Sequence, residues 1–443
     1  MQIFDRLTDA DAMRGLFQLR LPEFAAGNLG LTRCDILYAR YKTFVRPQSR
    51  HKSHLALCYE LAVSDGAGCP IGTQLLYAKA FRDGGSAQRF SAATAERLAA
   101  PRFGRAVLHL ADLDMVIWAF PNDPELPHLA CLVDPKAVLP FLPYDSLPPS
   151  VDGPDDVANV SAQVIHYYPE KRCTARYLLS AVHGASRQTL SLIGKTYRDR
   201  KGLEVHRHMQ NLWEISQRAG DFAVAEPLGY NDAVKTVWQK DMPGVPVGHL
   251  LTAAKRRHWL TRIAKGLASL HRNVPASAAN YGVTDPLGDL PNKVEKLGHA
   301  FADLRDPLRA LHHAIEQWAR QRYAPAQTFI HGDFHLRQLL AHEESMVFLD
   351  FDECALGDPL QDLASFIVDL HFYDFAPAEL ESLSAAFLRA YMDQCGWEVR
   401  RDDLAWYIRL QFFTKAYRAY RQHLPEREAR VRELLALAQG WPI

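Results

Sequence analysis

The sequence has no excess of charge of either sign. Its 443 residues include 51 Lys and Arg and 51 Asp and Glu, so the formal net charge at pH 7 is zero. Without an overall positive field, binding to a nucleic acid is disfavoured. Apolar residues make up 48% of the chain and charged residues 23%, as in folded globular proteins, and the length predicts two or three structural units.

The sequence also lacks a segment expected to enter or cross a membrane. It contains no run of about 18 apolar residues. The acidic segment 1–15 is unlike a signal peptide or a transit peptide. The seven cysteines are scattered, without a CxxC pair that could begin a structural zinc site. These absences predict a cytoplasmic protein with neither a membrane partner nor a structural zinc ion.

Strand-like segments precede helical segments along the chain. The segment 140–156 is rich in Pro, Gly, Ser and Asp, as linkers are, and strand-like stretches lie before it and directly after it. From about residue 250 onward, apolar residues recur at helical spacing, as in 251–273, 376–395 and 403–439. This order predicts an α+β protein rather than one of alternating βαβ units.

Two parts of the sequence match each other in three consecutive blocks. QLLYAKAFRD, around Lys79, matches LSLIGKTYRD, around Lys195, and one block upstream and one downstream match in the same order. The offset is nearly constant, since Trp118 corresponds to Trp238. We interpret the match as a diverged internal duplication of a β-rich lobe. Two unrelated antiparallel sheets with similar strand patterns would be the alternative.

The segment TFIHGDFHLRQLLAHEESMVFLDFDECALGDPLQDLASF carries the candidate catalytic residues. Its two short apolar runs, 328–330 and 346–349, are each followed by an aspartate, Asp333 and Asp350. If the two runs pair, both carboxylates reach one end of a small sheet. One could then orient an attacking hydroxyl while the other holds Mg²⁺ on a phosphate, and phosphoryl transfer needs little more than such positioning and charge neutralisation. The amide oxygen of Gln338 would be a suitable further Mg²⁺ ligand.

HGDFHLRQ resembles the HGDxHxxN motif of aminoglycoside phosphotransferases, choline kinases and related enzymes. FLDFDECALGDPLQDLASF resembles the metal-binding motif that follows it in that family. The resemblance implies a bilobal protein kinase-like fold that uses ATP and Mg²⁺. It implies that Asp333 is the catalytic base or hydroxyl-orienting group, that Asp350 binds the metal, and that Gln338 replaces the usual second ligand, asparagine. Supporting roles are implied for His331, His335, Asp358 and Asp362.

The glutamine at position 338 is the main departure from this family pattern. Maltokinases are similar in having HGDxHxxQ, so glutamine is compatible with activity. After Asp350, however, this chain has Asp352-Glu353-Cys354, where maltokinases have Glu-Gly-Glu-Pro. The resemblance is therefore to the family as a whole.

The resemblance also implies nucleotide-binding residues upstream. Lys195 fits the strand lysine that contacts the α- and β-phosphates, and a glutamate of the following helix would hold it. Glu214 is preferred over Glu204, because the first copy has Glu96 at a comparable distance from Lys79.

The hairpin expected over the phosphates has no glycine-rich loop. Lys171 and Arg172 at its turn would instead reach phosphate by charge, although a solvated turn is an equal alternative. The segment 239–242 would be the hinge that meets the adenine, which places Gln239 and Met242 there.

Three units follow from these observations: an N-terminal cap (1–150), a kinase N-lobe (151–245) and a helical C-lobe (246–443). Only the second is expected to hold ATP, because it leads directly into the helical lobe. Lys195→Ala should therefore cripple ATP use and Lys79→Ala should leave it nearly unchanged. The cap could cover the active lobe, shape the substrate entrance or mediate dimerisation.

The predicted function is transfer of the γ-phosphoryl group of ATP to a hydroxyl of a sugar, polyol or amino alcohol. The alternative is a pseudokinase that binds nucleotide or acts as a scaffold. The sequence does not distinguish ATP from GTP as the phosphoryl donor. The region after residue 370 does not resemble a trap for polycations, so a neutral or mildly charged acceptor is preferred. Four arginines of the C-terminal helices are interpreted as a solvated face: Arg418, Arg421, Arg427 and Arg430.

Overall fold

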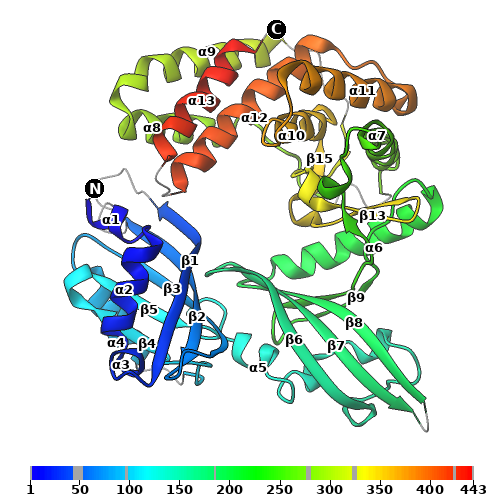
Figure 1. The fold of residues 1–443 in the computed structure, drawn as a ribbon. Coiled ribbons are helices and arrows are strands. Elements are labelled where there is room, and N and C mark those ends of the chain that lie inside the picture. The colour runs from blue at the N-terminus through cyan, green and yellow to red at the C-terminus, as the bar shows by residue number, and fades with distance from the viewer. Residues whose placement is uncertain are drawn as a thin grey trace.

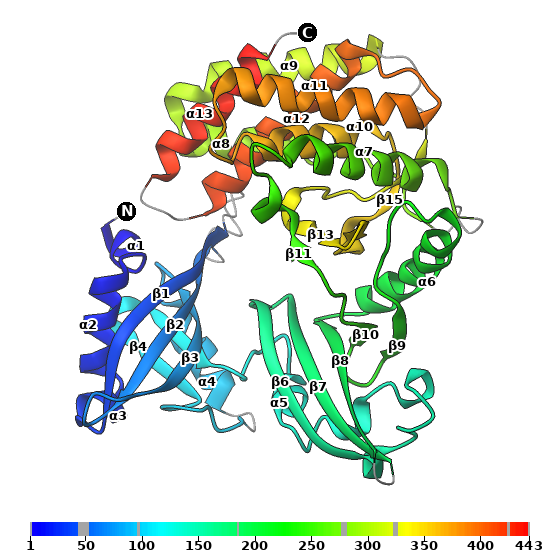
Figure 2. The same ribbon diagram turned by 45° about the vertical axis from the view of Figure 1, so that its right-hand side comes forward.

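Two β-rich lobes precede a helical lobe in the computed structural model of the protein (Figures 1 and 2). The structure describes residues 2–42, 53–94, 98–183, 186–275, 281–321, 327–422 and 426–441. Glu96 lies outside them. The predicted α+β arrangement, a two-lobed unit with an additional β-rich lobe before it, is confirmed. Within the described residues, none of the helices combines the length and the apolar character needed to cross a membrane.

The N-terminal lobe is a five-stranded antiparallel sheet in the order β1-β2-β3-β5-β4. Its strands are β1 (Leu29–Lys42), β2 (His54–Asp65), β3 (Pro70–Ala80), β4 (Val107–Leu110) and β5 (Met115–Ala119), and its helices are α1 (Gln2–Arg6), α2 (Ala10–Arg20), α3 (Pro22–Ala25) and α4 (Gly85–Thr94). Alternate residues of a strand face opposite sides. In β2, Leu55 and Leu57 join the core that includes Phe17 of α2, whereas Ala56 joins a second core with Trp118. This two-sided burial explains why β2 reads as an almost continuous apolar run.

The second lobe repeats this topology. Its sheet has the order β6-β7-β8-β10-β9, the same order as in the first copy. The elements are β6 (Val157–Tyr168), β7 (Arg172–His183), β8 (Ser186–Tyr197), α6 (Lys201–Ala219), β9 (Pro227–Asn231) and β10 (Thr236–Lys240). Lys79 pairs with Val116 across its sheet, and Lys195 pairs with Val237. The repeated strand order supports the predicted duplication, although the two registers differ by one residue, since Trp118 pairs with Tyr77 and Trp238 pairs with Gly194.

The connection between the two sheets packs against the second sheet. It contains α5 (Leu129–Val133) and short 3₁₀ turns, η3 (Leu139–Phe141), η4 (Tyr144–Ser146) and η5 (Pro154–Asp156). Apolar residues of this connection, among them Leu132, Val138 and Val151, share a core with Tyr177 and Trp238. The segment 140–156, expected to be a linker, therefore belongs to a connection that packs against the second sheet.

The helical lobe is built around α10 (Leu360–Leu370), in which every residue except Gln361 is buried. The other helices are α7 (Arg256–Arg272), α8 (Leu290–Ala300), α9 (Arg305–Gln321), α11 (Pro377–Cys395), α12 (Arg401–Arg421) and α13 (Arg427–Gly440), with η6 (Val247–Leu250) and η8 (Ala302–Leu304) as short turns. The helical pattern 403–439 is thus divided between two helices. Because α10 is buried, its two aspartates, Asp362 and Asp369, are buried as well, and their partners lie in the site described below.

The short strands of the helical lobe pair differently from the prediction. The apolar run 328–330 forms β12 (Thr328–Ile330), which pairs with β15 (Ala355–Gly357). The run 346–349 contributes to β14 (Ser345–Phe348), which pairs with β13 (Leu339–His342). β13 also pairs with β11 (Val245–Pro246). The expected pairing of the two runs is therefore wrong. The tight turn at Glu343, with φ 51°, closes a local hairpin, which loses less chain entropy than a longer loop would.

The N-terminal sheet reaches both other lobes. Figures 1 and 2 show the end of β1 close to the end of α12, where Arg40 and Gln422 form an isolated antiparallel bridge. The ring of Tyr38 in β1 packs edge-on against Tyr168 at the end of β6, with centroids 5.0 Å apart. The first copy of the sheet is therefore held against both sides of the two-lobed unit.

Candidate active site

A cleft of about 2200 Å³ separates the second lobe from the helical lobe. Its walls include Lys195 from β8, Met242 from the connection after β10, and Asp333, Gln338 and Asp350 from the helical lobe. Residues that the sequence assigned to catalysis, metal binding and nucleotide binding thus line one cavity.

The loop after β12 is held by a buried carboxylate. Asp362 accepts hydrogen bonds from the backbone N–H groups of His331, at 2.7 Å, and Gly332, at 2.9 Å, and lies 3.1 Å from Nε2 of His271. Gly332 has φ 83° and its α-carbon faces the backbone of Glu353, so no side chain fits there. Asp362, for which the resemblance implied a supporting role, positions the loop that carries Asp333.

The predicted bracing role of His331 has a clear geometry. Its Nε2 atom lies 2.8 Å from the backbone oxygen of Leu349, the residue before Asp350. The ring is fully buried, and burial lowers its pKa despite the nearby charge of Asp362. A neutral imidazole that donates from Nε2 therefore joins the Asp333 loop to the Asp350 loop.

Asp333 points into the cleft beside two cationic or potentially cationic groups. Oδ2 lies 3.5 Å from Nε2 of His335, and Oδ1 lies 3.4 Å from Nη1 of Arg418. Burial alone would raise the pKa of Asp333, but the His335 hydrogen bond and the charge of Arg418 outweigh it and lower the pKa below its usual value. The group is a carboxylate at neutral pH.

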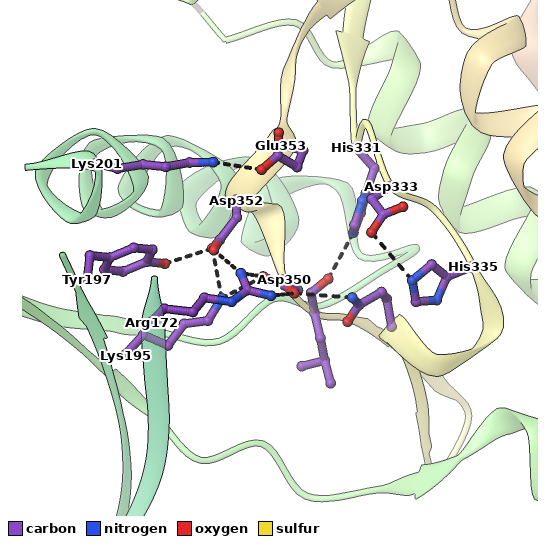
Figure 3. Close-up of polar contacts among 12 residues, drawn as sticks. Arg172, Lys195, Tyr197, Lys201, His331, Asp333, His335, Asp350, Asp352 and Glu353 are labelled. Atoms are coloured by element: carbon purple, nitrogen blue, oxygen red, sulfur yellow. Dashed lines mark hydrogen bonds and ion pairs between the residues drawn. The ribbon is translucent and has the colours of Figure 1, made fainter. Parts of the chain in front are cut away.

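Asp350 links the two lobes (Figure 3). It adopts a left-handed conformation, with φ 60°, directly after Leu349. Its Oδ1 atom lies 2.6 Å from Nζ of Lys195, and Oδ2 lies 3.1 Å from Nη2 of Arg172. Burial opposes ionisation, but the charges of Lys195 and Arg172 outweigh it and hold the pKa of Asp350 well below its usual range.

The sequence analysis missed Asp352, which lies in the 3₁₀ turn η10 (Phe351–Glu353). Its carboxylate accepts hydrogen bonds from Nζ of Lys195 and from the hydroxyl of Tyr197, each at 2.8 Å, and contacts Arg172 (Figure 3). The only signal in the sequence was a second aspartate two residues after Asp350. Asp352 is the acidic partner of Lys195 in addition to Asp350.

The expected pairing of Lys195 with Glu214 is wrong, and Glu204 does not replace it. Both glutamates are exposed on α6, whose opposite face carries Val205, Met209 and Leu212 into the core. That orientation turns the two carboxylates away from the Lys195 ammonium group. The acidic groups that contact Lys195, Asp350 and Asp352, both belong to the helical lobe.

The remaining predicted nucleotide residues lie along the cleft. Arg172 contacts the aspartates, whereas Lys171 faces the cavity next to it. Burial, with the charges of Arg40 and Arg421, lowers the pKa of Lys171 to about 8. Gln239 and Met242 line the same cleft. The apolar side chains of the cleft include Ile165, Ile193, Leu340 and Leu349.

The turn between β6 and β7 is anchored to the N-terminal lobe. Glu170, with φ 62°, contacts Lys79, and Lys42 lies 2.9 Å from its Oε2 atom. Asp123 accepts hydrogen bonds from the hydroxyl of Tyr167, at 2.6 Å, and from the backbone N–H of Glu170, at 2.8 Å. The hairpin that carries Arg172 is thus fixed from outside its own sheet.

Asp350 and Gln338 fit a hard divalent cation. Nε2 of Gln338 donates to Oδ2 of Asp350 at 3.2 Å, and a half-turn of the amide would place its oxygen beside that carboxylate. No cluster of three or more His, Cys, Asp or Glu side chains suited to a metal occurs among the described residues. The protein would then supply few ligands, as is usual for Mg²⁺ on a nucleotide.

Comparison with known protein families gives one match. The family model described as "Phosphotransferase enzyme family" (APH) matches residues 176–402. No curated protein matches the chain.

Several solved structures are similar. The choline kinase of Cryptosporidium parvum Iowa II is 13% identical, with a TM-score of 0.48 over 67% of this chain and 92% of that one. A choline/ethanolamine kinase family protein of Mesorhizobium loti is 14% identical, with a TM-score of 0.44 over 69% and 92%. The macrolide 2′-phosphotransferase of Brachybacterium faecium is 18% identical, with a TM-score of 0.41 over 64% and 93%.

Proposed function

We propose that this chain, which belongs to the phosphotransferase enzyme family, transfers the γ-phosphoryl group of ATP to a hydroxyl group of a small molecule. The observation that carries the proposal is the contact between Lys195 and Asp350, at 2.6 Å across the cleft. A buried lysine from the second sheet and an aspartate after β14 meet where phosphates and their metal would lie. Asp333 faces the same cavity.

In this proposal, ATP lies between the second lobe and the helical lobe. The adenine would occupy the apolar part of the cleft, next to Gln239 and Met242. Lys195 and Arg172 would turn from the aspartates to the phosphates, and Lys171 would add charge at the hairpin. Asp350 and the amide oxygen of Gln338 would hold Mg²⁺, which neutralises charge on the phosphates when bound.

Asp333 would accept a hydrogen bond from the acceptor hydroxyl and aim its oxygen at the γ-phosphorus. The new bond joins that oxygen to phosphorus, while the bond from phosphorus to the β–γ bridging oxygen breaks and its electrons remain on ADP. The hydroxyl proton passes to Asp333 and then to solvent. Because its lowered pKa makes Asp333 a weak base, its main role is orientation, with proton transfer late in the step.

Replacement of Asp333 by asparagine tests this function. Turnover of ATP, screened with a panel of small hydroxyl compounds, should fall at least about a hundredfold, whereas the affinity for an ATP analogue should change little. The control is Asp393→Asn, an exposed aspartate on α11. Undiminished turnover in Asp333→Asn would refute the assignment. Nucleotide binding without turnover on any compound would favour a pseudokinase.

A further inference from the structure

The wall of the cleft around Asp333 is strongly basic. The cationic side chains that line it from the helical lobe include Lys293 of α8, Arg337 of the 3₁₀ turn η9 (Leu336–Gln338), Lys415, Arg418 and Arg421 of α12, and Arg430 of α13. We call this set the basic wall. The sequence suggested that four arginines are only a solvated face, but Arg418 contacts Asp333, and Arg421, Arg427 and Arg430 line the cleft with it.

Several carboxylates near the basic wall are already engaged. Asp369 accepts a hydrogen bond from the backbone N–H of Leu336 at 3.0 Å. Asp333 is the group that would orient the acceptor hydroxyl. Glu433 forms an ion pair with Arg430 at 2.6 Å, and Asp289 lies 4.0 Å from Nζ of Lys293. Among the described residues, Arg337, Lys415 and Arg421 form no ion pair, so part of the positive charge of the basic wall is not neutralised by a carboxylate.

Lys415 and Arg418 are the cations of this wall most directly related to Asp333. They are three residues apart on α12 and so share one face of the helix. Among the described residues, Lys415 makes neither an ion pair nor a side-chain hydrogen bond, and its Nζ atom lies 5.5 Å from the centroid of the Phe372 ring. Burial, followed by the charge of Arg418, lowers the pKa of Lys415. An anion placed between these two side chains would relieve the repulsion and the loss of hydration.

We propose that the phosphoryl acceptor carries an anionic group, a carboxylate or a phosphate, which Lys415 and Arg418 bind while the acceptor hydroxyl reaches Asp333. This inference rests on the proposed function and specifies its substrate class. Charge-assisted hydrogen bonds from an ammonium and a guanidinium group are the usual means of holding such anions. A cationic amino alcohol would face like charges at the same place, which disfavours it.

An alternative use of the same cations is to stabilise the transferred phosphoryl group itself. In that case, replacing Lys415 or Arg418 would lower kcat with every acceptor and would not alter the preference among acceptors. Acceptor binding in the presence of a bound nucleotide analogue separates the two roles, because no phosphoryl group is transferred.

The experiment uses four compounds with one six-carbon skeleton: d-gluconate, d-glucitol 6-phosphate, neutral d-glucitol and cationic 1-amino-1-deoxy-d-glucitol. Each is titrated by calorimetry into the full chain saturated with Mg²⁺ and a non-hydrolysable ATP analogue. At least one anion should bind about tenfold or more tightly than d-glucitol, the equivalent of about 1.4 kcal/mol, and the amine should bind most weakly. The two anions distinguish a carboxylate site from a phosphate site.

Lys415→Gln and Arg418→Gln should each remove this preference and leave the affinity for the ATP analogue within about twofold. Arg401→Gln, an exposed arginine at the other end of α12, is the matched control and should keep the preference. The inference is overturned if neither anion binds more tightly than d-glucitol, or if the preference survives both substitutions. Failure of the ATP analogue itself to bind would instead contradict the proposed function.

Discussion

Lys79 of the N-terminal sheet forms an ion pair with Glu170 at the turn of the β6–β7 hairpin in the second sheet. Lys79 occupies the position in the first copy that Lys195 occupies in the second, since each lies on the middle strand of its sheet, β3 or β8, and pairs with a valine of the neighbouring strand. Lys195 contacts Asp350, whereas Lys79 contacts the hairpin that carries Arg172. The first-copy lysine thus makes a different contact from Lys195, with a hairpin at the edge of the cleft.

Glu170→Gln should raise the KM for ATP several-fold with a smaller change in kcat. Loss of this carboxylate frees Lys79 and Lys42 from the turn, so Arg172 is less well positioned. Lys79→Ala should have a similar effect, although the sequence alone suggested almost none. Steady-state kinetics and titration with an ATP analogue measure it.

The control for this prediction is Glu125→Gln, which alters an exposed glutamate in the connection between the lobes. An unchanged KM for ATP in Glu170→Gln, together with lowered thermal stability, would show that the ion pair stabilises the fold but does not position Arg172 for ATP.

The same ion pair predicts a dependence of stability on pH. Burial disfavours the charged form of Glu170, but the charges of Lys79 and Lys42 outweigh it and lower the pKa from 4.5 to about 2. A lowered carboxyl pKa stabilises the fold above the unfolded value, and this contribution is lost as pH falls through the folded value. The difference in unfolding free energy between wild type and Glu170→Gln, measured in urea, should therefore be constant above about pH 5.5 and lose about half its size by pH 3. A difference in unfolding free energy that does not change between these pH values would contradict a stabilising ion pair of charged Glu170 with Lys79 and Lys42.

The sequence predicted the parts of the fold that depend on local pattern and order. Matched blocks around Lys79 and Lys195 indicated two similar lobes, and the sheets indeed have the same strand order. The motifs around Asp333 and Asp350 predicted one shared cleft, because their spacing is short and their loops follow buried strands. These features are visible in a sequence because each is encoded within a few neighbouring residues.

Contacts between distant segments could not be predicted in the same way. Lys195 contacts Asp352 rather than Glu214 because α6 is turned about its axis so that Glu214 is exposed. That orientation is set by the packing of the apolar face of α6. Arg418 reaches Asp333 only because α12 lies beside the loop after β12. Both contacts depend on how whole helices pack, which no single sequence motif specifies.

Asp352→Asn should weaken ATP-analogue binding and lower stability, whereas Glu214→Gln should change neither. The asparagine keeps the size of the side chain but removes the charge that holds Lys195 and Arg172. Breaking a buried charge pair from one side costs about 3–5 kcal/mol in proteins, because the partner is left buried. Urea denaturation and calorimetry measure the two effects. Binding that is lost in Glu214→Gln and retained in Asp352→Asn would reverse the assignment.

Asp362→Asn should lower the free energy of unfolding by about 3 kcal/mol or more. Its carboxylate accepts from two backbone N–H groups and from His271, and hydrogen bonds to charged groups contribute about 1.5–3 kcal/mol each. An amide has only one oxygen, so its NH₂ group would face a donor. Asp402→Asn, exposed in the first turn of α12, is the control. A loss below about 1 kcal/mol, the scale of an ordinary neutral hydrogen bond, would show that the loop is held by other contacts.

Gln338→Asn and Gln338→Leu should differ in the Mg²⁺ dependence of nucleotide binding. Asparagine retains an amide oxygen on a shorter side chain. The backbone N–H of Leu349 donates to the backbone oxygen of Gln338 at 2.9 Å, so residue 338 and the Asp350 loop can shift together toward the metal. Leucine has nearly the same volume as glutamine but offers no oxygen, so Mg²⁺ would lose one of its few protein ligands. Titration of the ATP analogue at increasing Mg²⁺ should therefore require a higher Mg²⁺ concentration for Gln338→Leu than for Gln338→Asn, and Asp350→Ala should remove the dependence. The same Mg²⁺ requirement in the asparagine and leucine variants would exclude Gln338 from the metal site and leave the role of protein ligand to Asp350.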